Sequence, residues 1–246
     1  VWPAGTGRRT LATTDSTNLE AARQHAAGMD PPFWVMAERQ SAGRGRRGRA
    51  WLGGDGNFFA TYLMRVDAGP DRAALRSFVA ALALLDALDA VADLGPRITL
   101  KWPNDVLLDG GKLAGILLEA EGRPGALTLR IGIGVNLASA PAQATVEAGA
   151  VPPVALPAPV APATLLAELA PAMARWEARL QQQGFEPLRQ AWLARAARLG
   201  QTITARLPGA EHRGRFETLD ATGALVLATP LGPLRLAAGD VHLSGG

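Results

Sequence analysis

The sequence predicts an α+β protein with two domains, a larger one over residues 1–199 and a small one over residues 200–246. Three observations lead to this prediction. Short apolar runs typical of strands alternate with Gly- and Pro-containing turns in the first half of the chain. Longer stretches carry apolar residues at helical spacing among alanines. After Gly200 only short strand-like runs remain, which indicates a small β-barrel.

The composition is that of an ordinary globular protein, with 48% hydrophobic and 19% charged residues in a chain of 246. This length allows one domain with a sizeable core and a second, smaller one. There is no cysteine, which excludes disulfides, thiolate metal sites and a cysteine nucleophile. No signal-peptide pattern is visible, and the longest apolar run, Phe78–Leu85, is too short to cross a bilayer. We therefore expect a cytoplasmic protein.

Near the N-terminus, a helix is predicted to run to about Ala27, with Gly28 just past its end. Asp15, Ser16 or Thr17 can cap its start. Because a helix N-terminus presents unpaired N–H groups and a positive dipole end, Ser16 and Thr17 could also hold a polar ligand. On this stretch alone, plain capping is the simpler interpretation.

The most distinctive stretch, residues 38–51, combines five arginines with three glycines. We call it the Arg-Gly loop, and it lies between two predicted strands, Phe33–Ala37 and Asn57–Met64, that can hold it still. Glycine lets the backbone approach a ligand, and arginine offers a permanent charge and a fork of donors for carboxylate or phosphate. The loop predicts a cradle for an anion, although a solvated or nucleic-acid-binding Arg-Gly segment has the same composition. Trp51, at its end, serves either in packing or as a cover for a flat ligand ring.

Helices are predicted at three places besides the N-terminus. A core helix covers residues 71–94, where six apolar residues recur at helical spacing. Two more cover about 162–183 and 185–198, after a connection at 141–162 that holds six prolines and is expected to be irregular. The side chains expected to face the core from these last two helices are Trp176, Leu180, Leu188, Trp192 and Leu199.

Two predicted hairpins over residues 97–120 bring two cations, a carboxylate and an amide together. These groups are Lys101, Asn104, Asp105 and Lys112. The turn before Lys112 is predicted at Gly110-Gly111. Lys101 and Lys112 are the only two lysines among 25 basic residues. Chance could place them there, but a chain that otherwise uses arginine is expected to keep lysine where a compact point charge is needed.

Glycines inside predicted strands suggest close approach by a ligand or by another strand. Gly115 lies in the third strand of the hairpins, and Gly132 and Gly134 lie in a further strand over residues 126–137. Asn136, near the end of that strand, is either a turn former or a ligand contact.

The region after Gly200 has five short strand-like runs, with turn signals between them, in a span of about 45 residues. They cover 202–207, 214–219, 225–228, 234–237 and 241–243. Acidic and basic residues are balanced here, so no basic face for nucleic acid is expected.

Several kinds of chemistry are excluded because the sequence lacks the motifs that they require. The three histidines, His25, His212 and His242, lack metal-ligand spacing, and no nucleophile elbow, P-loop or dinucleotide fingerprint occurs. Arginine, lysine and glycine around one acidic turn suit a reaction run by positioning and electrostatics. Activation of a carboxylate by ATP is such a reaction, because the carboxylate is already ionised at pH 7 and needs no base. Cationic side chains and Mg²⁺ would bring the two anions together.

Five motifs follow one another between residues 9 and 137. They are Asp15-Ser-Thr-Asn18, Gln40-Ser-Ala-Gly-Arg-Gly-Arg-Arg-Gly-Arg-Ala-Trp51, Lys101-Trp-Pro-Asn-Asp105, Lys112-Leu-Ala-Gly-Ile-Leu-Leu-Glu119 and Gly132-Ile-Gly-Val-Asn136. In order and spacing they closely resemble the biotin–protein ligase (biotin–[acetyl-CoA-carboxylase] ligase) family. The chain departs from the family after Trp51, where Leu-Gly-Gly-Asp-Gly replaces a stretch that often contains Ser-Pro, so the path of the loop there is open. Because 15 residues precede Ser16, the resemblance is to members without an N-terminal DNA-binding domain.

The resemblance implies a mixed, mainly antiparallel sheet with helices, as in class II aminoacyl-tRNA synthetases, followed by an SH3-like β-barrel. It implies that biotin and MgATP form biotinyl-5′-AMP and pyrophosphate. The biotinyl group then passes to one lysine of the biotin carboxyl carrier protein of acetyl-CoA carboxylase. The expected partners include neither DNA nor a membrane, and a homodimer is possible.

The resemblance also implies roles for individual residues. The expected biotin contacts are Ser16, Thr17, Asn18, Gln40, Gly43, Arg44, Lys112 and Gly115. The expected nucleotide contacts are Arg46, Arg47, Arg49, Trp51, Lys101, Asn104 and Asn136, with Trp51 over the adenine. The expected catalytic residues are Lys112, Arg44 and Asp105. Asp105 is also the candidate Mg²⁺ contact and one candidate for the base of the transfer step.

Two other functions fit parts of this pattern. A lipoate- or octanoate-type acyl ligase shares the fold, but no His-containing motif of that relative is seen, and the Arg-Gly loop favours biotin. A nucleic-acid-binding protein would spread basic residues over a face and use aromatic side chains for stacking. The chain is only 5% aromatic with a net charge of +3, which argues against that function.

Overall fold

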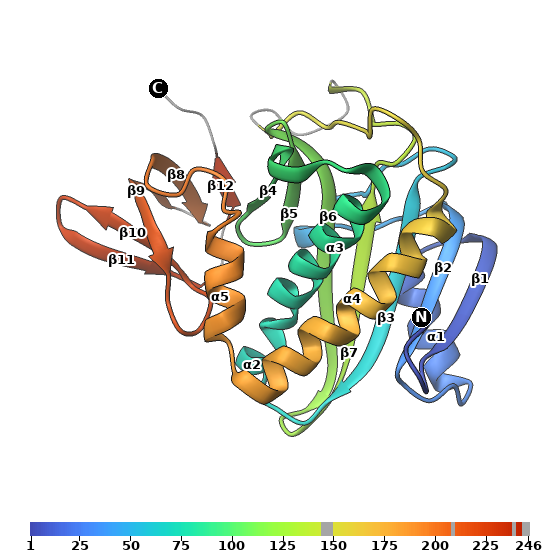
Figure 1. The fold of residues 1–246 in the computed structure, drawn as a ribbon. Coiled ribbons are helices and arrows are strands. Elements are labelled where there is room, and N and C mark those ends of the chain that lie inside the picture. The colour runs from blue at the N-terminus through green and yellow to red at the C-terminus, as the bar shows by residue number, and fades with distance from the viewer. Residues whose placement is uncertain (144–149, 208–209, 238–239, 243–246) are drawn as a thin grey trace.

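The structure, a computed structural model, describes residues 1–143, 150–207, 210–237 and 240–242. The larger part is built on a seven-stranded sheet in the order β1-β2-β3-β7-β6-β5-β4 (Figure 1). β1 is parallel to β2 and the other neighbouring pairs are antiparallel, so the predicted mixed, mainly antiparallel sheet is confirmed. The strands are β1 (Gly7–Thr14), β2 (Phe33–Gln40), β3 (Phe58–Val66), β4 (Ile98–Lys101), β5 (Asp105–Leu108), β6 (Gly111–Arg123) and β7 (Ala126–Val135).

β1 is a strand that the sequence did not reveal. It lies at the edge of the sheet, and most of its side chains, including Arg8, Arg9 and Thr10, are exposed. Without alternation between buried and exposed positions, no period-two pattern marks it as a strand. Its backbone pairs with β2 from Gly7 opposite Phe33 onward.

Helices cover both faces of the sheet. They are α1 (Thr17–Ala26), α2 (Pro70–Ala74), α3 (Arg76–Ala92), α4 (Pro162–Gln183) and α5 (Glu186–Leu193), with single 3-10 turns η1 (Arg46–Gly48) and η2 (Gly95–Arg97). Along β2, Trp34 and Met36 join the main core with α3 and α4, whereas Phe33 and Val35 pack with Ala21 of α1. Successive strand side chains point to opposite faces, so α1 lies across the sheet from α3 and α4 (Figure 1).

The predicted helical boundaries need two corrections. The helix expected over residues 71–94 is divided at Leu75 into α2 and α3. The last helix ends at Leu193 instead of Arg198, because the chain then turns to pair with β4, where Leu100 N–H donates to Arg195 O at 2.7 Å. The expected core position of Leu199 is wrong, since this side chain is 39% exposed. Trp176 is partly buried, and the other three side chains predicted to face the core are buried.

The hairpins form as predicted, with one shift at the second turn. The two turn residues are Asp109 and Gly110, with φ of 49° and 81°, and Gly111 is already the first residue of β6. Positive φ at both positions matches the type I′ turn favoured in two-residue hairpins. This turn leaves Lys112 as the second residue of β6, directly in the sheet.

The proline-rich connection is more ordered than predicted over its described part. Lys112 N–H donates to Pro152 O at 2.7 Å, and Val154 N–H donates to Lys112 O at 3.0 Å. Leu156 is buried. The segment from Pro152 to Leu156 therefore forms a wall beside Lys112; residues 144–149 of the connection lie outside the described part.

The C-terminal part is a five-stranded sheet in the order β11-β10-β9-β8-β12 (Figure 1). All its neighbouring strands are antiparallel, which agrees with the expected small SH3-like β-domain. Its strands are β8 (Thr202–Leu207), β9 (Ala210–Leu219), β10 (Leu225–Thr229), β11 (Gly232–Leu236) and β12 (Asp240–His242). Of the last predicted run, Leu243 lies outside the described residues. None of the described helices has the length and apolar character needed to span a bilayer.

Candidate functional site

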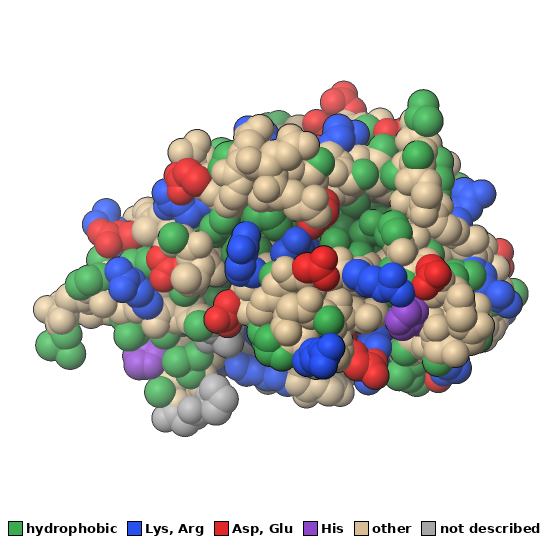
Figure 2. Space-filling view, turned by 90° about the horizontal axis from the view of Figure 1, so that it is seen from below, with side chains coloured by type: hydrophobic (Ala, Val, Ile, Leu, Met, Phe, Trp, Pro, Cys, Tyr) green, Lys and Arg blue, Asp and Glu red, His purple; other side chains and the backbone are tan. Residues whose placement is uncertain are grey.

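A cavity of about 600 Å³ lies on the α1 side of the large sheet. The N-terminus of α1, the Arg-Gly loop, the turn between β4 and β5, and strands β6 and β7 contribute to its walls. Gly132 of β7 faces it, packed against the Asn18 side chain, whereas Ile131 and Ile133 point into the main core. Figure 2 shows a face of the molecule that is hollowed, with hydrophobic side chains inside and charged side chains around it.

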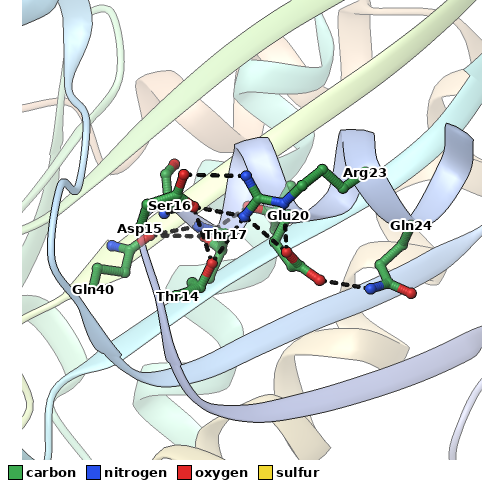
Figure 3. A network of polar contacts seen from close by, with 9 residues as sticks. Thr14, Asp15, Ser16, Thr17, Glu20, Arg23, Gln24 and Gln40 are labelled. Atoms are coloured by element: carbon green, nitrogen blue, oxygen red, sulfur yellow. Dashed lines mark hydrogen bonds and ion pairs between the residues drawn. The ribbon is translucent and has the colours of Figure 1, made fainter. Parts of the chain in front are cut away.

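At the α1 end, the backbone of the helix is satisfied by residues other than Ser16. Ser16 is the N-cap residue, but its side chain makes no capping hydrogen bond. Gln40 Oε1 accepts from Thr17 N–H at 2.7 Å, and Asp15 Oδ1 accepts from Ser16 N–H at 2.7 Å (Figure 3). Hydrogen bonds from Arg23 hold the pKa of Asp15 well below its ordinary value. The Ser16 hydroxyl therefore does not cap the helix, and Ser16 lines the cavity.

Beneath this end lies a buried polar network that sequence reasoning missed in part. The Thr61 hydroxyl, fully buried in β3, donates to Asn18 Oδ1 at 2.6 Å and lies 2.9 Å from Thr17 Oγ1. Asn18 Nδ2 donates to Glu119 Oε2 at 2.8 Å. Both heteroatoms of the Asn18 amide are thus engaged by the protein. Thr61 carries no motif, and contact across 43 residues leaves no local signal.

The two lysines of the chain meet at one carboxylate. Asp105 lies 2.7 Å from Lys112 Nζ and 3.2 Å from Lys101 Nζ, and we call these three residues the Lys-Asp-Lys cluster. Antiparallel pairing of β4 with β5 sets Lys101 opposite Asp105, and β6 brings Lys112 alongside. Burial would by itself raise the pKa of Asp105, but Lys112 and Lys101 outweigh it and lower that pKa to about 2. The Lys112 side chain is 31% exposed against 9% for Lys101, so Lys112 presents more of its surface to the cavity.

The Arg-Gly loop closes on itself beside the cluster. Gly45 N–H donates to Arg49 O at 2.7 Å, and Trp51 N–H donates to Gly43 O at 2.9 Å. Arg46 donates to Asn104 Oδ1 at 3.3 Å, which links the loop to the turn after β4. These contacts bring two motifs that are far apart in the sequence to the same rim of the cavity.

Trp51 is the group that approaches the strand glycines. A Cβ built on Gly115 would lie 2.9 Å from the indole, and one on Gly134 would overlap it. Lys112 Nζ lies 5.6 Å from the ring centroid, a distance suited to a cation–π contact. The indole Nε1 is buried and has no hydrogen-bond partner among the described residues. The flat Trp51 indole therefore fits against Gly115 and Gly134 because these two residues have no side chain.

Asn136, buried at the end of β7, has one engaged and one unengaged heteroatom. Its Nδ2 donates to Val154 O at 3.0 Å, which ties β7 to the segment after the proline-rich connection. Its Oδ1 is buried without a partner in the described part of the chain. An unpaired buried acceptor in a residue that lines the cavity is a position where a ligand donor would be stabilised.

The structure brings the predicted site residues together with one exception. Gly43 does not line the cavity; it packs behind, where a Cβ would meet Trp51 O at 2.7 Å. The predicted residues that line it are Ser16, Thr17, Asn18, Gln40, Arg44, Arg46, Arg47, Arg49, Trp51, Lys101, Asn104, Asp105, Lys112, Gly115 and Asn136. Asp105 is the one carboxylate among the described lining residues, and no group of three or more His, Asp or Glu suited to a metal occurs in the described ranges.

Comparison with known proteins agrees with the fold and the motifs. The model of the biotin/lipoate A/B protein ligase family matches residues 7–136, and that of the biotin protein ligase C-terminal domain matches residues 199–244. The chain is 52% identical over 240 residues to the biotin–[acetyl-CoA-carboxylase] ligase of Paracoccus denitrificans, covering 96% of this chain and 100% of that protein. Among solved structures, it is similar to the Aquifex aeolicus biotin protein ligase in complex with biotin and ATP, with a TM-score of 0.77, 21% identity, and 96% and 97% of the two chains covered. The Leishmania major biotin protein ligase in complex with biotinyl-5-AMP gives a TM-score of 0.69 at 22% identity, with 96% and 100% covered.

Proposed function

The chain belongs to the biotin/lipoate A/B protein ligase family, and we propose that its cavity performs both half-reactions of biotin ligation. Its activity is that of a biotin–[acetyl-CoA-carboxylase] ligase. The observation that carries the proposed mechanism is the Lys-Asp-Lys cluster, which faces the Arg-Gly loop across one cavity. The lysines of the cluster supply positive charge at one point of the cavity, and the arginines of the loop supply positive charge along its rim.

In the first half-reaction, a carboxylate oxygen of biotin attacks the α-phosphorus of MgATP. A P–O bond forms, the bond to the leaving pyrophosphate breaks, and biotinyl-5′-AMP results. No proton moves, because the carboxylate is ionised at pH 7. The barrier is mainly the approach of two anions, and preorganised cations in a shielded cavity lower it. We assign this role to Lys112, whose ammonium is held by Asp105 and remains partly open to the cavity.

In the second half-reaction, the ε-amine of the carrier lysine attacks the acyl carbon. The amide bond forms, the acyl–phosphate bond breaks, AMP leaves, and one proton of the amine is released. A carboxylate with a pKa of about 2 is a weak base for an ammonium group. We therefore assign Asp105 the role of positioning the two lysines and leave deprotonation to solvent or the leaving phosphate.

The cavity divides into two proposed regions. Ser16, Thr17 and Gln40 form a polar end suited to the ureido group of biotin, which offers N–H donors and a carbonyl acceptor. The unpaired Asn136 Oδ1 and the Arg-Gly loop form the proposed nucleotide end. These assignments rest on the chemistry of the lining groups.

Magnesium would arrive with the triphosphate as MgATP. Mg²⁺ is commonly bound through one or two carboxylates together with substrate phosphates. The described lining offers a single carboxylate, Asp105, and both its oxygens already face lysines. This donor set fits a metal carried mainly by the phosphates, with Asp105 as the protein contact.

The protein partner we propose is the biotin carboxyl carrier protein of acetyl-CoA carboxylase. Absence of DNA and membrane binding, a possible homodimer, a cytoplasmic location and a domain boundary between residues 199 and 200 remain predictions.

The test is exchange of labelled pyrophosphate into ATP in the presence of biotin, with lipoate and octanoate as matched controls. We expect exchange with biotin alone. Exchange with lipoate and none with biotin would overturn the specificity, and transfer of label from biotin to a carrier domain tests the second half-reaction separately.

A further inference from the structure

Glu119 of β6 connects three elements around the cavity. Its carboxylate accepts from Asn18 Nδ2 at 2.8 Å, next to the start of α1. It also faces Arg44 of the Arg-Gly loop, with Nη2 at 3.1 Å from Oε1 and 3.2 Å from Oε2. On the adjacent strand β7, Arg130 Nε lies 3.8 Å from Oε2. A carboxylate in the sheet therefore holds both a helix end and the loop.

These contacts give the Arg44 side chain a partner within the protein, in addition to its expected contact with the ligand anion. The family resemblance implies that Arg44 contacts the ligand anion, but its guanidinium already faces a protein carboxylate with both oxygens in reach. The backbone of the same residue pairs with Ala50 across the loop. Fixing the Arg44 side chain to the sheet thus fixes the base of the whole loop over the cavity.

The ion pair between Arg44 and Glu119 is also weak enough to break when the loop moves. The side chains of Arg44 and Glu119 are 40% and 25% exposed. A partly exposed ion pair contributes little to stability and is weakened by salt. Such a pair can hold a loop in the absence of substrate without preventing its release.

We propose that Glu119 is a positioning residue that latches the Arg-Gly loop to the sheet through Arg44 and so sets the affinity for biotin. The expected effect on KM for biotin rests on the proposed function of the cavity. The tethering of residues 44–50 is independent of any ligand.

The chain provides a matched control two residues away. Glu121 lies on the same face of β6, because alternate strand residues share a face. It pairs with Arg130 at 3.0 Å and is 74% exposed. Glu121→Gln removes the same charge near the same arginine as Glu119→Gln, but it leaves Arg44 and Asn18 with their partner.

The experiment compares Glu119→Gln, Glu121→Gln and the wild type. The glutamine carbonyl of Glu119→Gln can still accept from Asn18, whereas its amide no longer attracts Arg44. We expect amide exchange of residues 44–50 in the unliganded protein to rise by about threefold or more in Glu119→Gln and to stay unchanged in Glu121→Gln. We expect KM for biotin in pyrophosphate exchange to rise by about three- to tenfold, with kcat within about twofold.

Two further measurements exclude a merely structural effect. Raising NaCl from about 50 to 300 mM should increase loop exchange in the wild type and have less effect in Glu119→Gln. Arg44→Gln removes the more exposed partner of the pair. In the double variant Arg44→Gln/Glu119→Gln, the amides of the loop should exchange no faster than in either single variant. Equal loop exchange in Glu119→Gln and wild type, or additive effects in the double variant, would overturn the latch. Absence of any biotin-dependent exchange in the wild type would instead overturn the proposed function and leave the amide-exchange result standing.

Discussion

Lys112 Nζ lies 2.7 Å from Asp105 Oδ1, so that the second residue of β6 and the first residue of β5 form an ion pair inside the sheet. Lys112 Nζ also lies 5.6 Å from the centroid of the Trp51 ring. The lysine is thus held between a carboxylate and an aromatic face, and its charge is directed at one place in the cavity.

Lys112→Ala is expected to lower the rate of biotin-dependent pyrophosphate exchange by about 10²–10³-fold, the usual effect of removing a group that stabilises developing charge. Lys112→Arg should recover little, because a planar fork does not occupy the place of a compact ammonium. Melting temperatures of both variants serve as the folding control. Near-normal exchange in Lys112→Ala would exclude Lys112 from the reaction.

Asp105 should make stability depend on pH in acid. Its pKa in the folded protein, about 2, is below the ordinary value, so its ionised form stabilises the fold above about pH 4, the unfolded pKa. That contribution should be lost as the pH falls from about 4 to about 2. Urea midpoints of wild type and Asp105→Asn should therefore converge over this window. A difference between them that stays constant from pH 5 to pH 2 contradicts the assignment.

The contact of Trp51 with Gly134 predicts that Gly134→Ala weakens ATP binding. The added methyl group would overlap the Trp51 indole, which lies against the strand at this point. We expect KM for ATP to rise about tenfold or more, since the Trp51 ring and the loop that carries it must move. Gly69→Ala is the control, because Gly69 has an ordinary φ of −72° and nothing within 4 Å of a built Cβ. An unchanged KM in Gly134→Ala would show that the Trp51 indole can be displaced without loss of binding.

Trp102, next to Lys101, links the two sheets of the molecule. Its Nε1–H donates to Gly223 O at 3.0 Å in a buried contact. Trp102→Phe leaves that carbonyl unpaired, so the free energy of unfolding should fall by about 1–2 kcal/mol. Trp176→Phe also removes an indole hydrogen bond, to a partly buried Asp86. It should lower the free energy of unfolding by less than Trp102→Phe does. Equal urea midpoints for wild type and Trp102→Phe are the contrary outcome.

Biotin and ATP together should protect the Arg-Gly loop from amide exchange. Residues 43–50 carry four arginines and three glycines, so mutual repulsion and backbone freedom oppose order until an anion binds. We expect the protection of this segment to rise in the complex above the level set by Glu119. Equal protection of residues 43–50 with and without ligands contradicts this expectation.

The sequence alone revealed the chemical inventory of the site. Glycine and arginine in residues 38–51, and the restriction of lysine to positions 101 and 112, reflect residue types that few other positions could use in the same way. Local periodicity also revealed most buried strands and helices. β1 escaped because an edge strand with exposed side chains has no alternation to detect.

Only the tertiary structure decided which groups from distant parts of the chain meet. The hairpins already predicted that Asp105 lies near Lys112, whereas Glu119 reaches Arg44 across 75 residues of chain. It also decided that Trp51 lies on the strand glycines and that Asn18 is held within the protein. Residue type is a property of each position, and it limits which chemistry is possible. Contact between side chains far apart in the sequence, such as Glu119 and Arg44, depends on how loops, helices and sheet pack together, which no local pattern encodes.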